Sequence, residues 1–288
     1  MDTKVDTSAH AAPFGFWKRL LISPNGIVGL VIVLGLIFCA IFAEHLAPHN
    51  PAKMGTGGRF LPPNSDFFLG TDEFGRDMLS RILYGSRITL LIGAVAVGIS
   101  LTIGMLIGML AAFRRGWIEA ILMRSTDILF SFTETLIALS FVAVLGPSLQ
   151  NAVIAVGVAG IPFYARTCYS AALVETSKPY FEASISIGSS PGRLLFFHLL
   201  PNVLPTMIVV ATLGVSTAIL AAAGLSFLGL GAQPPTSEWG YMLAGSRDYI
   251  NRAPWLMTIP GLAIAITVLG FNLLGDGLRT SLDPVERK

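Results

Sequence analysis

Six long apolar runs leave few possible folds for this chain. They cover residues 27–46, 88–113, 125–145, 152–172, 203–230 and 255–278. A helix of about 20 mostly apolar residues crosses the hydrocarbon core of a bilayer and satisfies its own backbone hydrogen bonds there, and every run reaches that length. Gly104 and Gly108 form a GxxxG pattern in the second run, which permits close helix packing. The sequence therefore predicts an all-α, polytopic membrane protein with six transmembrane helices.

The composition excludes an ordinary soluble protein. Among the 288 residues, 53% are hydrophobic and only 12% are charged, whereas soluble domains carry roughly 25% charged residues. With 19 basic and 17 acidic residues and no long block of like charge, the chain offers no surface suited to nucleic acid. Cys39 and Cys168 form no CxxC pair, so we expect neither a disulfide nor a zinc site. His45 and His49 have no third ligand nearby, and no metal is expected there.

The distribution of lysine and arginine indicates how the spans are oriented. Six spans place both termini on one side of the membrane, and basic residues are more frequent in the loops and tails on that side than in the opposite loops. Because basic loops stay in the cytoplasm, we expect both termini to be cytoplasmic. The expected organisation starts with a cytoplasmic tail over 1–26, a first transmembrane helix over 27–46 and an extracytoplasmic segment over 47–87. A five-helix core over 88–279 and a cytoplasmic tail over 280–288 follow. The core includes a cytoplasmic loop over 173–202 and an extracytoplasmic loop over 231–254.

The cytoplasmic loop over 173–202 carries two helix-start signals. Ser177 is a candidate N-cap and Pro179 suits a first helical turn, so a short helix is predicted there, and Gly188 can end it. Ser190, followed directly by Pro191, repeats this start signal and predicts another helix of about ten residues that starts at Pro191. Two short helices joined by a glycine turn form a docking surface for a cytoplasmic partner. The alternative is an amphipathic pair that lies on the membrane without a partner.

Three segments, spread along the chain in a fixed order, carry a resemblance to a known family. The cytoplasmic loop contains Glu-Ala-Ser at 182–184, then Gly188, then Leu-Pro at 200–201. The other segments are LGTDEFGRD at 69–77, and LSFLGLG at 225–231, which precedes Pro-Pro and Glu-Trp-Gly. They resemble the integral-membrane permease subunits of binding-protein-dependent ABC importers, in particular the dipeptide, oligopeptide and nickel branch. The start FWKRLLISPNGIVGL is similar to the N-terminal region of the same branch.

The resemblance implies a subunit whose cytoplasmic helices sit in a cleft on an ATPase, so that closure of two ATPases moves the spans between inward and outward openings. The residues that it assigns to this coupling are Glu182, Ala183, Ser184, Gly188, Pro191, His198 and Pro201. Ser184 stands where the family usually has a second alanine, and this small-for-small exchange leaves a helix intact. The implied partners are a second homologous permease, two ATPase subunits, an extracytoplasmic solute-binding protein and the lipid bilayer.

The resemblance also implies a location in the bacterial inner membrane and the import of peptides or similar small solutes. Related permeases serve peptides, glutathione and nickel, so the solute stays open. The chain contains no G-x-x-x-x-G-K-[ST] phosphate loop, so ATP and Mg are expected on the partner ATPases and no cofactor on this chain. The alternative is an ion-coupled secondary transporter, although no convincing internal repeat is present. A membrane enzyme is disfavoured because no GxSxG or HExxH motif occurs.

Two acids of the third run are candidates for the lining of a passage. Asp127 and Glu134 are seven residues apart, hence on similar faces of a helix, and acids within a span usually face a cavity or a partner. They would form a polar lining that contacts a cationic end of the solute. Alternatively, Asp127 pairs with Arg124 at the membrane interface and Glu134 binds a neighbouring polar group. Family members commonly have a proline around Thr133 and Glu134, so this departure bears on the choice of solute.

Two extracytoplasmic segments are candidates for contact with the binding protein. Phe74, Met78 and Ile82 form an apolar helical stripe, so a helix on the membrane surface is predicted over 71–87. The candidate contact residues are Asp72, Arg76, Asp77, Pro234, Pro235 and Trp239. The alternative for the first segment is a helix that only anchors the chain at the membrane surface.

Overall fold

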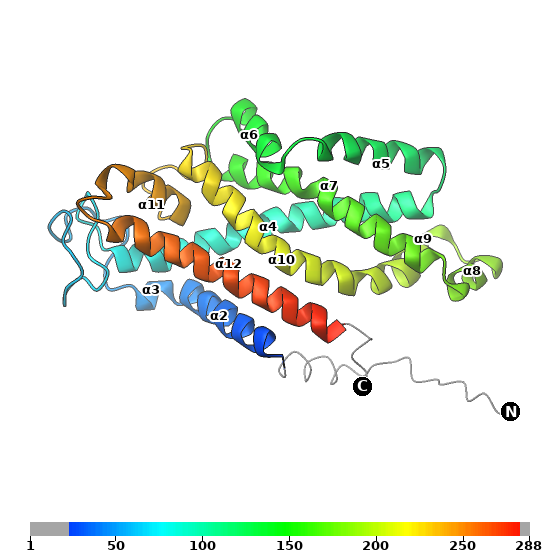
Figure 1. Cartoon of the computed structure of the whole chain (residues 1–288), viewed down its shortest axis with the longest axis horizontal. Coiled ribbons are helices and arrows are strands. Elements are labelled where there is room, and N and C mark those ends of the chain that lie inside the picture. Colours follow the sequence, from blue (N-terminus) through cyan, green and yellow to red (C-terminus); the bar gives the residue numbers. More distant parts are fainter. Residues whose placement is uncertain (1–22, 283–288) are drawn as a thin grey trace.

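The computed structural model describes residues 23–282, which form helices joined by loops (Figure 1). The elements are α2 (Pro24–Ile41), α3 (Ala43–Leu46), α4 (Met78–Phe113), α5 (Trp117–Phe130), α6 (Glu134–Leu145), α7 (Leu149–Thr176), α8 (Pro179–Ser186), α9 (Pro191–Arg193), a π-helical turn (Leu194–Leu199), α10 (Leu200–Phe227), α11 (Trp239–Gly245), a 3-10 turn (Arg247–Tyr249) and α12 (Trp255–Leu282). Within 23–282 there is no strand, only an isolated bridge between Thr71 and Asp77. The all-α prediction is confirmed. The tails expected over 1–26 and 280–288 lie largely outside the described residues.

Five helices are long and apolar enough to cross a membrane, and a bent pair can supply a sixth span. The five are α2, α4, α7, the continuous helix over 191–227, and α12. The bent pair is α5 with α6. α2 begins and α12 ends on the side of the bundle toward α8, although both stop short of α8, while α11 lies at the opposite end (Figure 1). The fold is therefore that of a multi-pass membrane protein, as the sequence predicts.

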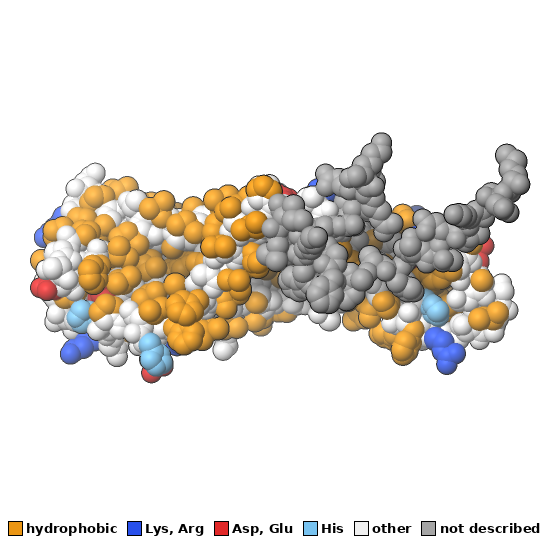
Figure 2. Space-filling model, turned by 90° about the horizontal axis from the view of Figure 1, so that it is seen from below, with side chains coloured by type: hydrophobic (Ala, Val, Ile, Leu, Met, Phe, Trp, Pro, Cys, Tyr) orange, Lys and Arg blue, Asp and Glu red, His pale blue; other side chains and the backbone are white. Residues whose placement is uncertain are grey.

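The outer surface suits a bilayer. Figure 2 shows apolar side chains over much of one long face, with charged side chains gathered toward its two ends. On α2, Val31, Leu34 and Ile41 are exposed. An apolar belt between two polar ends is the surface that lipid covers, because exposed apolar side chains are favourable there and charged ones are not.

α4 and α7 pack closely where the GxxxG pattern lies. A Cβ atom at Gly104 would lie 2.6 Å from the Cβ of Tyr164, and one at Gly108 would lie 2.5 Å from the carbonyl oxygen of Ala165. Both distances are too short for any side chain, so only glycine allows this approach. The expected close packing is confirmed, and α5 and α10 pack against this pair of helices.

The third apolar run is broken, which differs from the prediction of one helix over 125–145. α5 and α6 are bent by 88° at the break. The Ser131 hydroxyl donates to the Asp127 carbonyl oxygen at 3.0 Å, a bond of the kind that bends helix ends. Thr133 then starts α6 as its N-cap, since its hydroxyl oxygen accepts from the Leu136 N–H at 3.4 Å.

The prediction of a separate surface helix over 71–87 is wrong. The chain before Met78 is a loop, and α4 begins at Met78 and continues for 36 residues, about 54 Å. The Asp77 carboxylate caps it by accepting from the Ser80 N–H at 3.0 Å and from the Ser80 hydroxyl at 2.6 Å. Met78 packs in a buried cluster with Trp239 of α11. Met78 and the partly buried Ile82 of the apolar stripe therefore pack on protein at the end of the bundle, whereas Phe74 is exposed.

The loop over 173–202 follows its prediction in part. α8 has Lys178 rather than Ser177 at its N-cap, because the Ser177 hydroxyl donates to the Val174 carbonyl oxygen at 2.8 Å. Gly188 adopts a φ of +80° and ends the turn after α8, as predicted. The helix that starts at Pro191 does not stop: it passes through the π-helical turn into α10. The second expected helix is therefore the first part of a span.

Candidate functional site

α8 forms the tip of one end of the molecule (Figure 1). Phe181 and Ser184 are buried against the bundle, whereas Glu182 and Ala183 face outward. Large apolar side chains are exposed at the same tip, namely Ile185, Ile187, Phe196 and Phe197. Ile187 is 82% exposed, which is unusual for isoleucine on a free protein surface. Exposed apolar side chains grouped around polar ones suit a contact with another protein or with the membrane surface.

A hydrogen-bonded cluster joins α8 to two spans. The Glu175 carboxylate, at the end of α7, accepts from Lys178 Nζ at 2.6 Å and from the Tyr180 hydroxyl at 2.5 Å. The Tyr180 oxygen accepts from Asn202 Nδ2 of α10 at 3.2 Å. Burial and the hydrogen bond to Glu175 raise the pKa of Tyr180, so the hydroxyl keeps the proton that it donates. These hydrogen bonds therefore tie α8 to the ends of α7 and α10.

Other residues assigned to coupling by the resemblance lie in or next to this cluster. The Ser184 hydroxyl donates to the Tyr180 carbonyl oxygen at 2.9 Å, so the serine is accommodated within α8. The His198 carbonyl oxygen accepts from Asn202 Nδ2 at 2.6 Å, which ties the π-helical turn to the same asparagine. Pro201 is exposed on the first turn of α10. The loop thus acts as one structural unit.

A recess of about 360 Å³ opens beside α8. Its walls come from the end of α4, the end of α7 and one side of α8. Glu182 and Ile185 contribute from α8, and Arg115 contributes from the residues after α4. The recess adjoins the exposed face of α8, so three elements contribute to one continuous surface.

The opposite end of the bundle holds a buried ion-pair network. Asp72 Oδ2 accepts from Arg76 Nε at 2.6 Å and also from Arg81. Asp72 Oδ1 accepts from the backbone N–H groups of Phe74 and Arg76 at 2.8 and 2.9 Å. Arg76 Nη2 also lies 3.3 Å from Glu73 Oε1. These contacts fix the loop before α4, because a buried charge is tolerated only when partners surround it.

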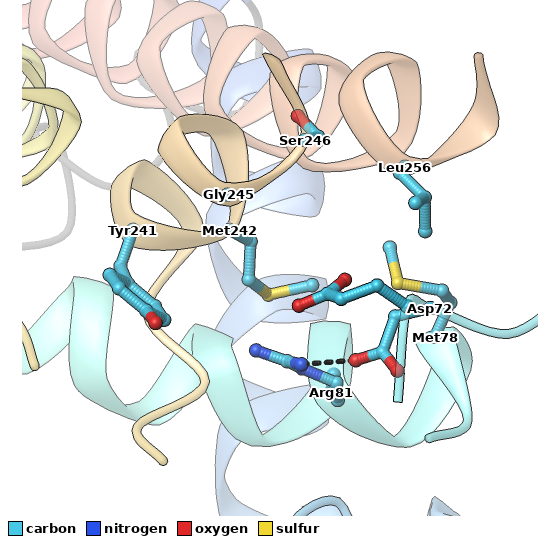
Figure 3. Close-up of a pocket in the computed structure, with 9 residues that line it drawn as sticks. Asp72, Met78, Arg81, Tyr241, Met242, Gly245, Ser246 and Leu256 are labelled. Atoms are coloured by element: carbon cyan, nitrogen blue, oxygen red, sulfur yellow. Dashed lines mark hydrogen bonds and ion pairs between the residues drawn. The ribbon is translucent and has the colours of Figure 1, made fainter. Parts of the chain in front are cut away.

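A small cavity lies next to this network (Figure 3). Arg81 of α4 and Met242 of α11 point toward it, with Leu256 of α12 on its far side. Its volume of about 20 Å³ is that of a single water molecule, so it does not hold a solute. Burial raises the pKa of Glu73, which lines the same cavity. The network fixes the loop before α4 onto the start of α4, next to α11 and α12.

The burial of this network corrects the prediction for the contact with a binding protein. Four of the six residues expected there are buried: Asp72, Arg76, Asp77 and Trp239. The Trp239 indole Nε1 donates to the Ile82 carbonyl oxygen at 3.1 Å, so it anchors α11 on α4. Pro234 and Pro235 are exposed in the loop before α11. Only these two prolines are placed where another protein can reach them.

α5 lies against α7 through two pairs of side chains. Arg166 of α7 donates to the Asp127 carboxylate, and the Tyr169 hydroxyl donates to the Glu119 carboxylate. Asp127 therefore pairs across two helices and not with Arg124, as one alternative supposed. The Asp127 and Arg166 side chains are 49% and 57% exposed, so the pair lies on an open face of the protein.

Glu134 lines a separate cavity of about 330 Å³ between α6 and α7. A Cβ atom at Gly160 would lie 3.7 Å from Glu134 Oε1, so the carboxylate lies against α7. Among residues 23–282, no hydrogen bond or ion pair compensates its charge. The buried Tyr164 hydroxyl is a polar neighbour of Glu134 but forms no hydrogen bond, so the alternative of a bound polar neighbour is met only in part. Asp127 and Glu134 do not meet, because the break between α5 and α6 places them in different cavities.

Family models match both parts of the chain. Residues 104–288 match the binding-protein-dependent transport system inner membrane component, a stretch that includes α8 and both acids. The chain belongs to this permease family. Residues 15–63 match the N-terminal transmembrane domain of oligopeptide transport permease C. The permease is thus a multi-pass protein of the inner membrane.

Relatives of the permease are similar over most of their length. The di/tripeptide transport system permease protein DppC of Pseudomonas aeruginosa is 45% identical over 275 residues, which cover 93% of this chain and 91% of the relative. The dipeptide transport system permease protein DppC of Escherichia coli K12 is 44% identical and the alignment covers 93% and 92%. The glutathione transport system permease protein GsiD of Pectobacterium atrosepticum is 41% identical, with coverage of 93% and 90%.

A solved structure has the same fold. The methionine ABC transporter MetNI, in an inward-facing conformation, contains a chain that matches with a TM-score of 0.60 and 22% identity. The match covers 72% of the permease and 98% of that chain. The helical arrangement is therefore that of an ABC transporter permease.

Sequence analysis did not single out several residues that hold the permease together. Arg166 is a charged residue within the apolar run over 152–172. A charged side chain in such a run predicts an oppositely charged partner on a neighbouring helix, which here is Asp127. Tyr180 and Asn202 are 22 residues apart, and no periodicity predicts their contact. The folded chain brings them together because α8 turns back toward the start of α10.

Proposed function

We propose that this permease forms half of the passage of an ATP-driven importer for dipeptides and tripeptides. It works beside a second, homologous permease, and two separate ATPase subunits bind ATP and Mg and hydrolyse the nucleotide. An extracytoplasmic binding protein delivers the peptide. The support for the solute is that relatives at 44 and 45% identity are named as dipeptide and di/tripeptide permeases.

The observation that carries this proposal is the attachment of α8. Its outward face bears Glu182 and exposed apolar side chains, while Tyr180 on its inward side contacts Glu175 of α7 and Asn202 of α10. When the ATPases close on α8, these contacts transmit the movement to two spans. A helix that only lay on the membrane would need no such connection to the spans.

The end of the molecule that carries α8 is the cytoplasmic end in this proposal. The excess of lysine and arginine on that side supports the orientation. The loop before α4, together with α11, then faces outward, and the exposed Pro234 and Pro235 lie on that side. An ion-coupled carrier, the alternative from sequence, has no support in the family or in its named relatives.

Copurification and transport test the proposal together. The permease, tagged at its C-terminus, is extracted in mild detergent from cells that make the partners, and the proteins that copurify are identified by mass spectrometry. A second permease and two ATPases in stoichiometric amount, with ATP-dependent uptake of dialanine after reconstitution with the binding protein, are the expected result. A chain that purifies alone and catalyses uptake by itself under an ion gradient contradicts it.

A further inference from the structure

One side of α7 forms the floor of a groove that runs under α5 and α6. Two cavities of about 330 Å³ each lie along it. The residues of α7 that line them follow helical spacing: Ala159, Pro162, Phe163, Arg166, Tyr169 and Ser170. Because these positions share one stripe of α7, the two cavities lie one after the other along the same side of α7, and we call this side the groove.

The Asp127–Arg166 pair shows what the groove faces. Arg166 lies ten residues before the end of α7, about 15 Å along the helix, and both side chains of the pair are about half exposed. A half-exposed ion pair at such a depth is unfavourable in contact with lipid tails, and charged residues in spans face water-filled or protein-lined space. The groove therefore faces water or a neighbouring protein chain and not lipid.

The second cavity offers a charge without a partner. Glu134 lines it beside the hydroxyl-bearing Ser131 and Thr133, with the rings of Phe130 and Phe163 also present. The carboxylate lies against α7 at Gly160, and no described residue forms an ion pair with it. A cation that enters this cavity gains an uncompensated carboxylate and an aromatic wall.

We propose that the groove is a binding site for zwitterionic short peptides, in which Glu134 binds the α-ammonium group and Arg166 binds the α-carboxylate in place of Asp127. This inference rests on the proposed function and assigns the recognition of both peptide termini to this permease. The peptide side chains lie along the apolar and aromatic wall, which does not select among different side chains. Recognition therefore depends on the two ends.

The positions of the two charges leave room for a short peptide. Glu134 Oε1 lies near Gly160 of α7, and Arg166 is six residues further along, a rise of about 9 Å along the helix axis. Six residues also turn the helix by about 600°, so the two positions lie about 120° apart around α7 and the charges are separated by more than this rise. An extended dipeptide spans at most about 7 Å and a tripeptide about 10 Å, so the flexible Arg166 side chain must extend toward Glu134 to bind the same peptide.

Exchange of partners at Arg166 also links binding to movement. Asp127 is one of two side chains of α5 that bond to α7, and the other is Glu119. A peptide carboxylate that takes over Arg166 releases Asp127 and leaves α5 held at Glu119 alone. Arrival of the peptide thus loosens α5 from α7.

The test uses the complete importer in proteoliposomes, with its binding protein and radiolabelled dialanine. Arg166→Gln and Glu134→Gln are each expected to lower the rate of uptake about 10-fold or more, the loss of one charge-assisted contact. Assembly with the partners and ATP hydrolysis stimulated by the loaded binding protein are expected to remain. Uptake at the wild-type rate in both variants overturns the inference while the proposed function stands.

A charge exchange separates a binding role from a structural one. The double variant Asp127→Arg, Arg166→Asp restores an ion pair between α5 and α7 but places the cation on the other helix. If Arg166 serves the peptide, uptake stays low in the double variant, and recovery to the wild-type rate overturns the inference. Arg279→Gln removes an exposed cation from the last turn of α12, outside the groove, and is the matched control, expected to keep wild-type uptake. An equal loss in this control overturns the assignment to Arg166.

The substrate termini supply an independent measurement. In the wild-type importer, N-acetyl-dialanine and dialanine amide are loaded on the binding protein at saturating concentration, and uptake per bound peptide is compared. Both are expected to enter at least about 10-fold more slowly than dialanine. Equal rates for all three overturn the inference. Absence of ATP-driven dialanine uptake by the wild-type importer overturns both the inference and the proposed function.

Discussion

The Tyr180 hydroxyl donates to the Glu175 carboxylate at 2.5 Å and so connects α8 directly to the end of α7. The phenol oxygen also accepts from Asn202 of α10, so one side chain contacts the ends of two spans. A hydrogen bond to a charged group contributes about 1.5–3 kcal/mol when it is partly shielded from water. This contact is the shortest route by which a movement of α8 reaches the membrane.

Removal of that hydroxyl is expected to weaken coupling without unfolding the permease. In Tyr180→Phe the ring keeps its packing, but Glu175 keeps only Lys178 as a hydrogen-bond partner. We expect the number of peptides imported per ATP hydrolysed to fall about 10-fold or more, which corresponds to the lower bound of about 1.5 kcal/mol for a hydrogen bond to a charged group. The measurement is the ratio of dialanine uptake to phosphate release in proteoliposomes.

The matched control removes a hydroxyl at the other end of the bundle. Tyr249 follows α11 and its ring packs against Phe60, so Tyr249→Phe is expected to leave the ratio unchanged. A ratio in Tyr180→Phe equal to that of the wild type would show that the bond has no part in coupling. A fall in both variants would point to a general effect of the hydroxyl losses.

Reversal of charge on the exposed face of α8 is expected to abolish coupling. Glu182 is exposed and forms part of the proposed docking surface, so Glu182→Lys changes the partner contact and leaves the fold of the permease intact. We expect ATP hydrolysis stimulated by peptide and binding protein to fall at least about 10-fold, with normal insertion. Glu44→Lys reverses an exposed acid on α3 at the opposite end and is expected to have no effect. Unchanged stimulation in Glu182→Lys would remove α8 from the docking surface.

Much of the fold follows from local features of the sequence. Apolar length alone predicts the spans, and Gly188 predicts the end of α8 because a residue with φ of +80° favours glycine. The break between α5 and α6 was not predicted, because it depends on a single local competition at Ser131 and Thr133 within an otherwise apolar run. The start of α4 was also misplaced, since a hydropathy window ignores the cap that Asp77 supplies.

The candidate sites were harder to predict, because their contacts join distant segments. Asp127 is recognisable as an acid in a span, but Arg166 is its partner only because α5 lies against α7. In the sequence, Asp72 and Arg76 suggest a charged surface, yet both are buried. Their charges are tolerated there because Arg81, one turn into α4, also donates to the Asp72 carboxylate. A pattern shows which residue types are present, and only the packing of helices shows whether water or protein surrounds them.

Close packing of α4 on α7 gives a prediction for stability. A side chain at Gly108 would lie 2.5 Å from a backbone oxygen of α7, whereas one at Gly98, on the same helix, would meet nothing within 4 Å. Gly108→Leu is expected to destabilise the permease by about 3 kcal/mol or more, because the helices must separate. Gly98→Leu is expected to have little effect. Thermal unfolding of the detergent-purified protein measures both, and equal midpoints would contradict the packing.

The buried network before α4 gives a prediction for pH. Burial raises the pKa of Glu73 above its ordinary value of 4.5, so the folded protein holds this proton more tightly than the unfolded chain does. The folded state therefore binds more protons over the window above 4.5, and its stability falls as the pH rises through that window.

Glu73→Gln removes the titration. The stability of the wild type relative to this variant is expected to decrease from pH 4.5 upward, as followed by thermal unfolding at a series of pH values. Glu44→Gln, an exposed acid at the same end, controls for a general charge effect. A difference between wild type and Glu73→Gln that is constant with pH, or that grows in favour of the wild type, would show that Glu73 is ionised in the fold at no cost.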